Sequence, residues 1–191
     1  MPEIIDLSQE IFPGMPVYPG LPEVEITVHV SHEQWDGITD SDVVTPAVNR
    51  LEMGEHTGTH VDAINHMARQ YRGQSIDTMP LTMFYMEGIC LDLSYKGLRE
   101  LIEVGDLERA LSAAGLEIKR GDTILTGVIG VSNKEVHHVC GELGFTHYEN
   151  MVNLHLLIGR GRFRFIGLPL KIRGGTGSPV RAVAVFEGAR T

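Results

Sequence analysis

Alternating and helical patterns of apolar residues predict a chain of many short strands and few helices. Residues 24–30 alternate apolar and polar side chains, which predicts a half-buried strand. The largely apolar segment 88–94, GICLDLS, predicts a strand buried on both faces. Between Asp106 and Ala114, apolar residues recur at i, i+3, i+4 and i+7, and Gly115 follows where a glycine cap belongs. This is the clearest predicted helix.

Further strands and one more helix complete the pattern. A helix is expected over 134–143, and further strands are expected at 3–8, 123–126, 128–131, 163–170 and 179–187. The last two strands are joined by the glycine-rich connector KIRGGTGS. Many strands and few helices in mixed order predict an α/β or α+β fold with a curved, partly barrel-like mixed sheet.

The polar and acidic segment 31–46 predicts a loop or flap. Its single tryptophan, Trp35, is either a packing anchor or a lid over an aromatic ligand. Packing is the favoured interpretation, because buried aromatic side chains are common.

Size and composition predict one cytoplasmic domain spanning residues 1–191. The chain has 191 residues, no run approaching 18 apolar residues and no basic, apolar leader at its N-terminus, so no membrane partner is expected. Cys90 and Cys140 are the two cysteines, which suits a reducing compartment. The formal net charge of −9 argues against a nucleic-acid partner, which requires a basic surface.

The segment HTGTHVDAINH, residues 56–66, predicts a metal site. The segment is expected to be extended or looped. In an extended backbone His56, His60 and Asp62 would share one side with Gly58, which leaves room for an ion or ligand. Two imidazoles and a carboxylate are typical ligands of Zn²⁺ or Mn²⁺, and three protein ligands leave a position open, as a catalytic metal requires. The alternative is a set of ordinary polar residues near a turn.

Three more residues are weaker candidates for the same metal site. His66 follows Asp62 by four positions and is a candidate for a further ligand or for the general base. His137 lies on the second predicted helix, and Glu149 follows it by twelve positions. Taken alone, His137 and its neighbour His138 would be two solvated histidines on a helix.

The segment HTGTHVDAINH resembles the signature H-x-G-T-H-x-D-x-P-x-H of the cyclase family of metal-dependent hydrolases, which includes kynurenine formamidases and isatin hydrolases. Four further segments resemble that family in the same order: DLSQEIFPGMPVYPG, GDTIL, HHVCGELGFTHYENMVNL and GRFRFIGLPLKIRGGTGSPVRAVAV. The resemblance implies a swivelling β/β/α fold, usually oligomeric, so a homodimer or homotetramer is expected. It also implies one or two divalent ions, Zn²⁺ or Mn²⁺.

The resemblance also implies roles for individual residues. His56, His60 and Asp62 match metal ligands, and His137 and Glu149 match ligands that complete a second metal position. His66 matches the residue that handles the proton, and His138 matches no role.

The chain departs from the family pattern in two places. Ile64 stands where the signature has proline, which loosens the turn that carries His66. The middle of the chain is also short, because LTGVIGV runs straight through a region that is longer in the family. Either this is a trimmed member, or residues are absent from the sequence near 127–133; the second interpretation is favoured and predicts a break between Gly127 and Val128.

The combined prediction is a metal-dependent hydrolase that cleaves an amide-type C–N bond of a small aryl or cyclic substrate, as an arylformamidase does. No G-x-S-x-G elbow offers a serine nucleophile. The nearest alternative is a hydrolase of lactones or other cyclic esters on the same metal centre. Another is a non-catalytic metal-binding module closed by four protein ligands. A phosphate cradle at GGTGS is disfavoured, because the segment lacks the G-x-x-x-x-G-K-[ST] order.

Overall fold

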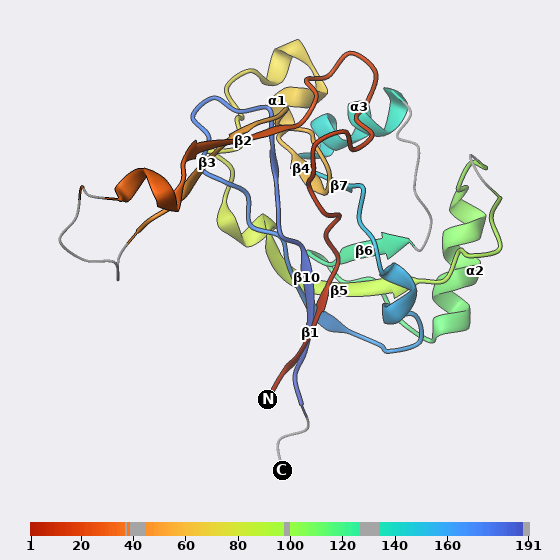
Figure 1. The fold of residues 1–191 in the computed structure, drawn as a ribbon. Coiled ribbons are helices and arrows are strands. Elements are labelled where there is room, and N and C mark those ends of the chain that lie inside the picture. The colour runs from red at the N-terminus through yellow and green to blue at the C-terminus, as the bar shows by residue number, and fades with distance from the viewer. Residues whose placement is uncertain (37, 39–44, 98–99, 127–133, 189–191) are drawn as a thin grey trace.

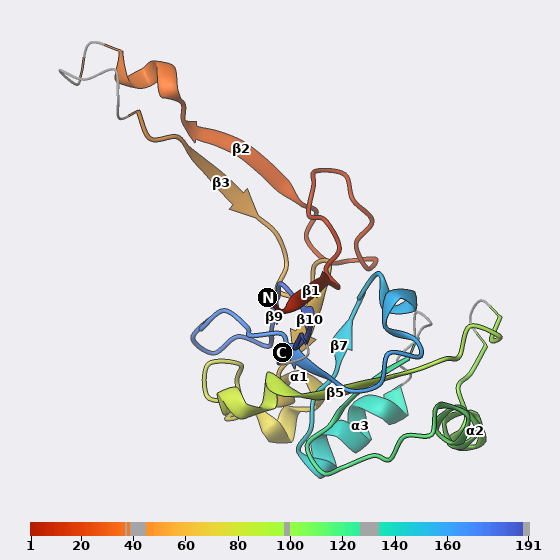
Figure 2. The ribbon, with the colours of Figure 1, turned by 90° about the horizontal axis from the view of Figure 1, so that it is seen from below.

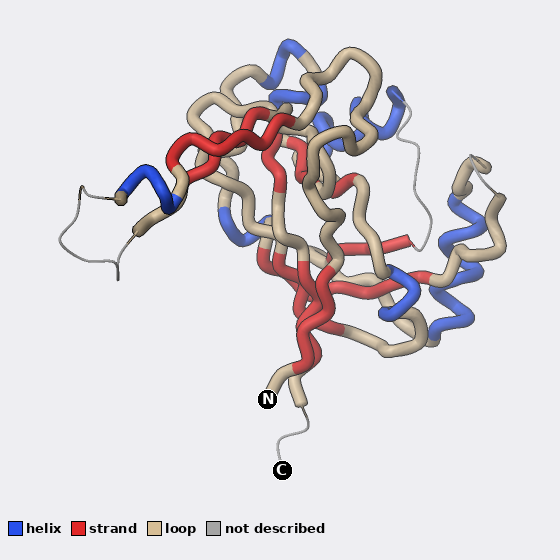
Figure 3. Tube along the Cα trace, in the orientation of Figure 1, coloured by secondary structure: helices blue, strands red, loops and turns tan. Residues whose placement is uncertain are grey.

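A mixed five-stranded sheet carries one of the hydrophobic cores. The computed structural model describes residues 1–36, 38, 45–97, 100–126 and 134–188. In spatial order the strands of this sheet are β1 (Glu3–Asp6), β10 (Val183–Phe186), β8 (Phe163–Ile166), β5 (Tyr85–Leu91) and β6 (Thr123–Thr126) (Figures 1 and 3). β5 and β6 run parallel, and the other neighbours are antiparallel. The predicted α/β class with a mixed sheet and few helices is confirmed.

Alternation along these strands builds the core. Phe163 and Phe165 of β8 are buried, whereas Arg162 and Arg164 between and beside them are partly exposed. The buried run of β5 packs against the helix α2 (Val104–Ala114). That helix ends as predicted, since Gly115 adopts the left-handed conformation with φ of 63°.

A smaller antiparallel sheet lies beside the five-stranded one and holds the centre of the predicted motif. Its strand order is β7 (Tyr148–Glu149), β4 (His60–Asp62) and β9 (Gly177–Pro179). Two helices lie next to this sheet in Figure 1, α1 (Ile64–Met67) and α3 (Lys134–Leu143). A second core, which includes Val61, Ile64 and Phe84, packs α1 against the sheet. The glycine-rich connector was predicted as a link only, but its end forms β9.

The strands β2 (Glu25–Val30) and β3 (Val48–Glu52) form a two-stranded arm that projects from the rest of the chain (Figures 1 and 2). The 3-10 helix η1 (His32–Trp35) lies at its far end. The predicted strand over 24–30 is therefore present, but the half-buried prediction was wrong, because no residue of either strand is buried. Trp35 is not a lid over this chain's own motif; its Nε1 donates to the carbonyl of Pro46 at 2.7 Å.

Three more 3-10 helices complete the described elements: η2 (Arg69–Tyr71), η3 (Leu81–Met83) and η4 (Leu154–Leu157). The predicted strand at 128–131 and the predicted break between Gly127 and Val128 lie outside the described residues. Within the part of the chain that the structure describes, no helix has the length and apolar character needed to cross a membrane.

Candidate metal centre

The motif HTGTHVDAINH folds as a turn followed by the short strand β4. Gly58 has a φ of +61°, a left-handed conformation that favours glycine. Its carbonyl then accepts a hydrogen bond from Nδ1 of His60 at 2.8 Å. An extended or looped segment was expected from His56 to Asp62, and the structure combines the two, since only residues 60–62 are strand and a turn precedes them. Gly58 serves the turn and packs near Ile11 and Met15 rather than making room for an ion.

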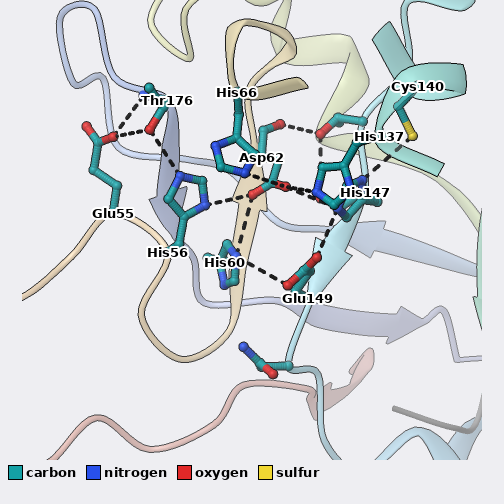
Figure 4. Close-up of polar contacts among 12 residues, drawn as sticks. Glu55, His56, His60, Asp62, His66, His137, Cys140, His147, Glu149 and Thr176 are labelled. Carbon is teal, nitrogen blue, oxygen red and sulfur yellow. Dashed lines mark hydrogen bonds and ion pairs between the residues drawn. The ribbon is translucent and has the colours of Figure 1, made fainter. Parts of the chain in front are cut away.

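The six predicted site residues nevertheless come together around one carboxylate. Asp62 is central and only 1% exposed. Its Oδ1 lies 2.8 Å from Nδ1 of His56 and 3.5 Å from Nε2 of His60. Its Oδ2 lies 3.7 Å from Nε2 of His137 and 3.9 Å from Nε2 of His66. Glu149 closes the cluster, with its Oε2 3.8 Å from Nε2 of His60 (Figure 4).

Pairing of β4 with β7 explains why segments so distant in sequence meet. His60 is paired with Glu149 across the two strands. The backbone N–H of Asp62 donates to the carbonyl of His147 at 3.2 Å, and the hydroxyl of Thr146 donates to the carbonyl of Asp62. These bonds hold the carboxylates of Asp62 and Glu149 on one side of the sheet.

Two of the imidazoles direct a lone pair at the Asp62 carboxylate. Nδ1 of His60 carries its proton, because it faces a carbonyl, which only accepts. The hydroxyl of Thr176 donates to Glu55 at 2.7 Å and therefore accepts from Nε2 of His56 at 3.0 Å. In neutral rings the other nitrogens, which face Asp62, are then unprotonated. Lone pairs directed at a buried carboxylate repel it unless a cation lies among them, so these residues fit a divalent metal ion.

The end of the connector supports His56 directly. A side chain at Gly177 would overlap the His56 ring, so only glycine allows this approach. The backbone N–H of Thr176 donates to Glu55, and that of Gly174 donates to Asp77. Thr176 was not predicted as a site residue, and the donors that a phosphate cradle would need are already engaged here.

A further histidine, His147, also lies in the cluster. Its Nε2 is 3.0 Å from Oδ2 of Asp62 and 3.1 Å from Oε1 of Glu149. Asp62, His137, His147 and Glu149 form one group whose ligand atoms lie within 4.8 Å of one another, and His56, Asp62 and His66 form another. Sequence reasoning missed His147, although its position two residues before Glu149 is the spacing that puts two side chains on one face of a strand.

The charge of the cluster shifts several pKa values. Burial raises the pKa of Asp62, but in the metal-free chain hydrogen bonds from His147 and His56, each of which needs a proton on the nitrogen that faces the carboxylate, outweigh it and hold that pKa well below its usual range. Burial also lowers the pKa of His147, yet its contacts with Asp62, Cys140 and Glu149 raise it to about 11 in the metal-free chain. Contact with His147 lowers the pKa of Glu149. A cation, either a proton or a metal ion, is thus favoured between these carboxylates.

His66 lies at the open edge of the cluster. Its side chain is 37% exposed, and its ring centre is 4.2 Å from that of His56. Ile64, which replaces the proline of the signature, is buried and begins α1, so His66 keeps a defined place. Burial lowers the pKa of His66, and His56 and His137 add to that effect against the opposing charge of Asp62.

His138 points elsewhere on the same helix as His137. It is exposed and lies 3.4 Å from Glu142. Leaving His138 out of the predicted site agrees with this placement.

Comparison with known proteins points in one direction. The sequence model of the family described as "Putative cyclase" matches residues 5–143. A kynurenine formamidase of Salinibacter ruber is 28% identical over 214 aligned positions, which cover 94% of this chain and 96% of the relative. The alignment is longer than the 191 residues of the chain, so the relative carries insertions that this chain lacks.

Solved structures share the fold over nearly the full chain. An isatin hydrolase bound to the product analogue thioisatinate superposes with a TM-score of 0.76 at 22% identity, covering 98% of this chain and 93% of its own. A protein described as a potential metal-dependent hydrolase with cyclase activity gives a TM-score of 0.68 at 20% identity, covering 98% of this chain and 100% of its own.

Proposed function

Because the chain belongs to the cyclase family, we propose that it is a metal-dependent hydrolase of amide-type C–N bonds. The observation that carries the proposal is the convergence of imidazole nitrogens on the buried carboxylate of Asp62. The substrate class follows from the relatives, one a kynurenine formamidase and the other an isatin hydrolase. We therefore propose a small aryl formamide or cyclic amide as substrate.

We assign the residues of the cluster to two roles, metal ligands and a general base. We assign His56, His60 and Asp62 to one ion position, and His137 and Glu149 with Asp62 to a second. The two oxygens of Asp62 face the two groups separately, which suits one carboxylate shared by two ions. Zn²⁺ and Mn²⁺ are the proposed ions, because both accept imidazole and carboxylate ligands.

His66 is the proposed general base. A divalent ion, when bound, would supply a Lewis acid that polarises the substrate carbonyl and acidifies water. His66 would take a proton from the attacking water and return it to the leaving nitrogen as the C–N bond breaks. Its lowered pKa keeps the ring neutral and able to accept a proton near neutral pH. The products would be a carboxylic acid and an amine, which remain one molecule when the amide is cyclic.

A substrate screen with and without chelator tests this function. N-formyl aryl amines, cyclic amides and lactones would be offered to metal-loaded protein, to chelated protein and to chelated protein with metal restored. We expect hydrolysis of the amides that chelator abolishes and metal restores. Hydrolysis of lactones alone would favour the ester alternative. Bound metal without turnover of any substrate would favour the non-catalytic module.

We also propose that the chain forms a homodimer or homotetramer through its arm. The strand register places Ile26, Val28 and Leu51 on one face of the arm, and the other face carries Thr27 and Arg50. Val28 is 69% exposed and Leu51 is 54% exposed. A two-stranded hairpin is at best marginally stable alone in water, so this apolar face needs a cover that a second copy would provide.

The cytoplasm is the proposed location. Cys90 and Cys140 are both free and buried, as expected where thiols stay reduced. We propose that the chain binds a small-molecule substrate and that neither nucleic acid nor a membrane is its partner.

A further inference from the structure

His147 lies where a metal ligand would lie, although neither the motif nor the family resemblance points to it. It lies directly before β7, the strand that carries Glu149, and its side chain reaches into the cluster (Figure 4). Its Nε2 lies 3.0 Å from Oδ2 of Asp62, compared with 3.7 Å for Nε2 of His137. The same nitrogen lies 3.1 Å from Oε1 of Glu149, so one ring nitrogen faces both carboxylates.

The donors around His147 form a set that suits one ion. Asp62, Glu149, His137 and His147 each offer one atom, and all four atoms lie within 4.8 Å of one another. Two carboxylate oxygens and two imidazole nitrogens are oxygen and nitrogen ligands of the kind that Zn²⁺ and Mn²⁺ accept. The side chain of His147 is only 19% exposed, so solvent only weakly screens its electrostatic interactions with the two carboxylates.

The opposite side of the His147 ring is also arranged as for a ligand. Nδ1 faces the sulfur of Cys140 at 3.7 Å, and Cys140 is fully buried on α3. A proton on Nδ1 that points to this sulfur leaves the lone pair of Nε2 directed at the carboxylates. Metal-binding histidines are generally oriented in this way by a partner on the second nitrogen.

We propose that His147 is a direct metal ligand that completes a four-residue site with Asp62, His137 and Glu149, and that Cys140 orients its ring. The proposal rests on the proposed metal centre but goes beyond it. It makes the two ion positions unequal, because four protein ligands serve this position and three serve the one at His56, His60 and Asp62. The four-ligand position is therefore expected to bind its ion more tightly, and the three-ligand position to remain the more open one.

Metal titration of His147→Ala tests the assignment without reference to turnover. Chelated wild-type, His147→Ala, Cys140→Ala and His138→Ala proteins would be titrated with Zn²⁺ against a chromophoric chelator, and bound metal would be counted per chain. Loss of an outer partner of a ligand typically weakens metal binding by about 10–100-fold. We expect His147→Ala to exceed that loss or to bind one ion fewer, Cys140→Ala to weaken binding by about 10-fold, and His138→Ala to match wild type.

A spectroscopic measurement separates a ligand from a positioning residue. The visible absorption of Co²⁺-loaded protein reports the donor set, so it should change in His147→Ala and remain that of wild type in His138→Ala. His147→Gln serves as a second variant if His147→Ala does not fold by circular dichroism. Unchanged metal count, affinity and Co²⁺ spectrum in a folded His147 variant would overturn the proposal. If metal binding behaves as expected but wild type hydrolyses no substrate, the proposed function fails while the ligand assignment stands.

Discussion

Nε2 of His56 lies 3.0 Å from the hydroxyl of Thr176, a residue 120 positions away in the sequence. Since that hydroxyl donates to Glu55, it accepts the His56 proton and directs the opposite nitrogen toward Asp62. Thr176→Val keeps the shape of the side chain and removes this acceptor. We expect metal affinity to fall by roughly 10–100-fold, as for other outer partners of metal ligands.

Thr176→Ser is the matched control, because it keeps the hydroxyl and should bind metal nearly as wild type does. Competition titration with Zn²⁺ measures both variants. Equal Zn²⁺ affinities of Thr176→Val and Thr176→Ser would show that the hydroxyl does not orient His56.

His66→Ala tests the assignment of the proton carrier. We expect metal content to be retained and the turnover rate to fall by about 100-fold or more, the typical contribution of a general base. Elemental analysis and steady-state kinetics on an aryl formamide measure the two quantities. Loss of metal together with activity would instead make His66 a ligand, the role that its grouping with His56 and Asp62 allows.

The pH dependence of wild type follows from the lowered pKa of His66. A base works in its neutral form, so kcat/KM should rise with pH through a pKa below 6.5 and level off above it. A bound cation would lower this pKa further, so it does not reverse the direction. An inflection above pH 6.5 in wild type would contradict this assignment.

His60→Ala tests the metal ligands of the motif itself. His60 is buried, and its Nε2 faces both Asp62 and Glu149, so its loss removes a nitrogen from the interior of the cluster. We expect substoichiometric metal after dialysis and little activity, with His138→Ala as the unaffected comparison. Full occupancy of His60→Ala by elemental analysis would refute the ligand assignment.

The extent to which the site could be predicted depends on sequence separation. His56, His60 and Asp62 lie in one short segment, so spacing alone indicated their shared chemistry. His137 and Glu149 became candidates only through the family resemblance, because a helix and a strand far from the motif carry them. Thr176 could not be predicted, since only the pairing of β4 with β9 brings it to His56.

The fold shows the same division between local and distant information. Periodicity located α2 and its glycine cap, because helix formation depends on neighbours within a few residues. Alternation also located the strand that became β2, but it gave the wrong burial. The alternating pattern shows that one face of the strand is apolar. It does not show whether the residues that bury this face belong to the same chain or to another one.

Gly141 connects the fold to the site. It lies within α3, where glycine costs about 1 kcal/mol relative to alanine, yet a Cβ there would overlap the ring of Tyr71. Overpacking typically costs about 1–3 kcal/mol, so Gly141→Ala should lower the free energy of unfolding despite the gain in helix propensity. It should also weaken metal binding, because α3 carries His137.

Gly105→Ala is the control for helix propensity. Gly105 lies in α2, and a Cβ there would meet only the end of the flexible Arg109 side chain, at 3.4 Å. We expect this variant to be as stable as wild type or more stable in urea denaturation. If Gly141→Ala stabilises the protein to the same degree, the packing of Tyr71 against α3 does not constrain this position.

Val28→Lys tests self-association through the arm. The residue lies on the apolar face with Ile26 and Leu51, and burying an unpaired ammonium group in an interface costs several kcal/mol. We expect the dissociation constant of the oligomer to rise by about 100-fold or more, since each 1.4 kcal/mol is a factor of ten. Thr27→Lys places the same charge on the opposite, polar face of the same strand and should leave the oligomer intact. Sedimentation velocity over a range of concentrations measures both variants: a monomeric wild type, or equal dissociation of the two variants, would refute an interface on this face.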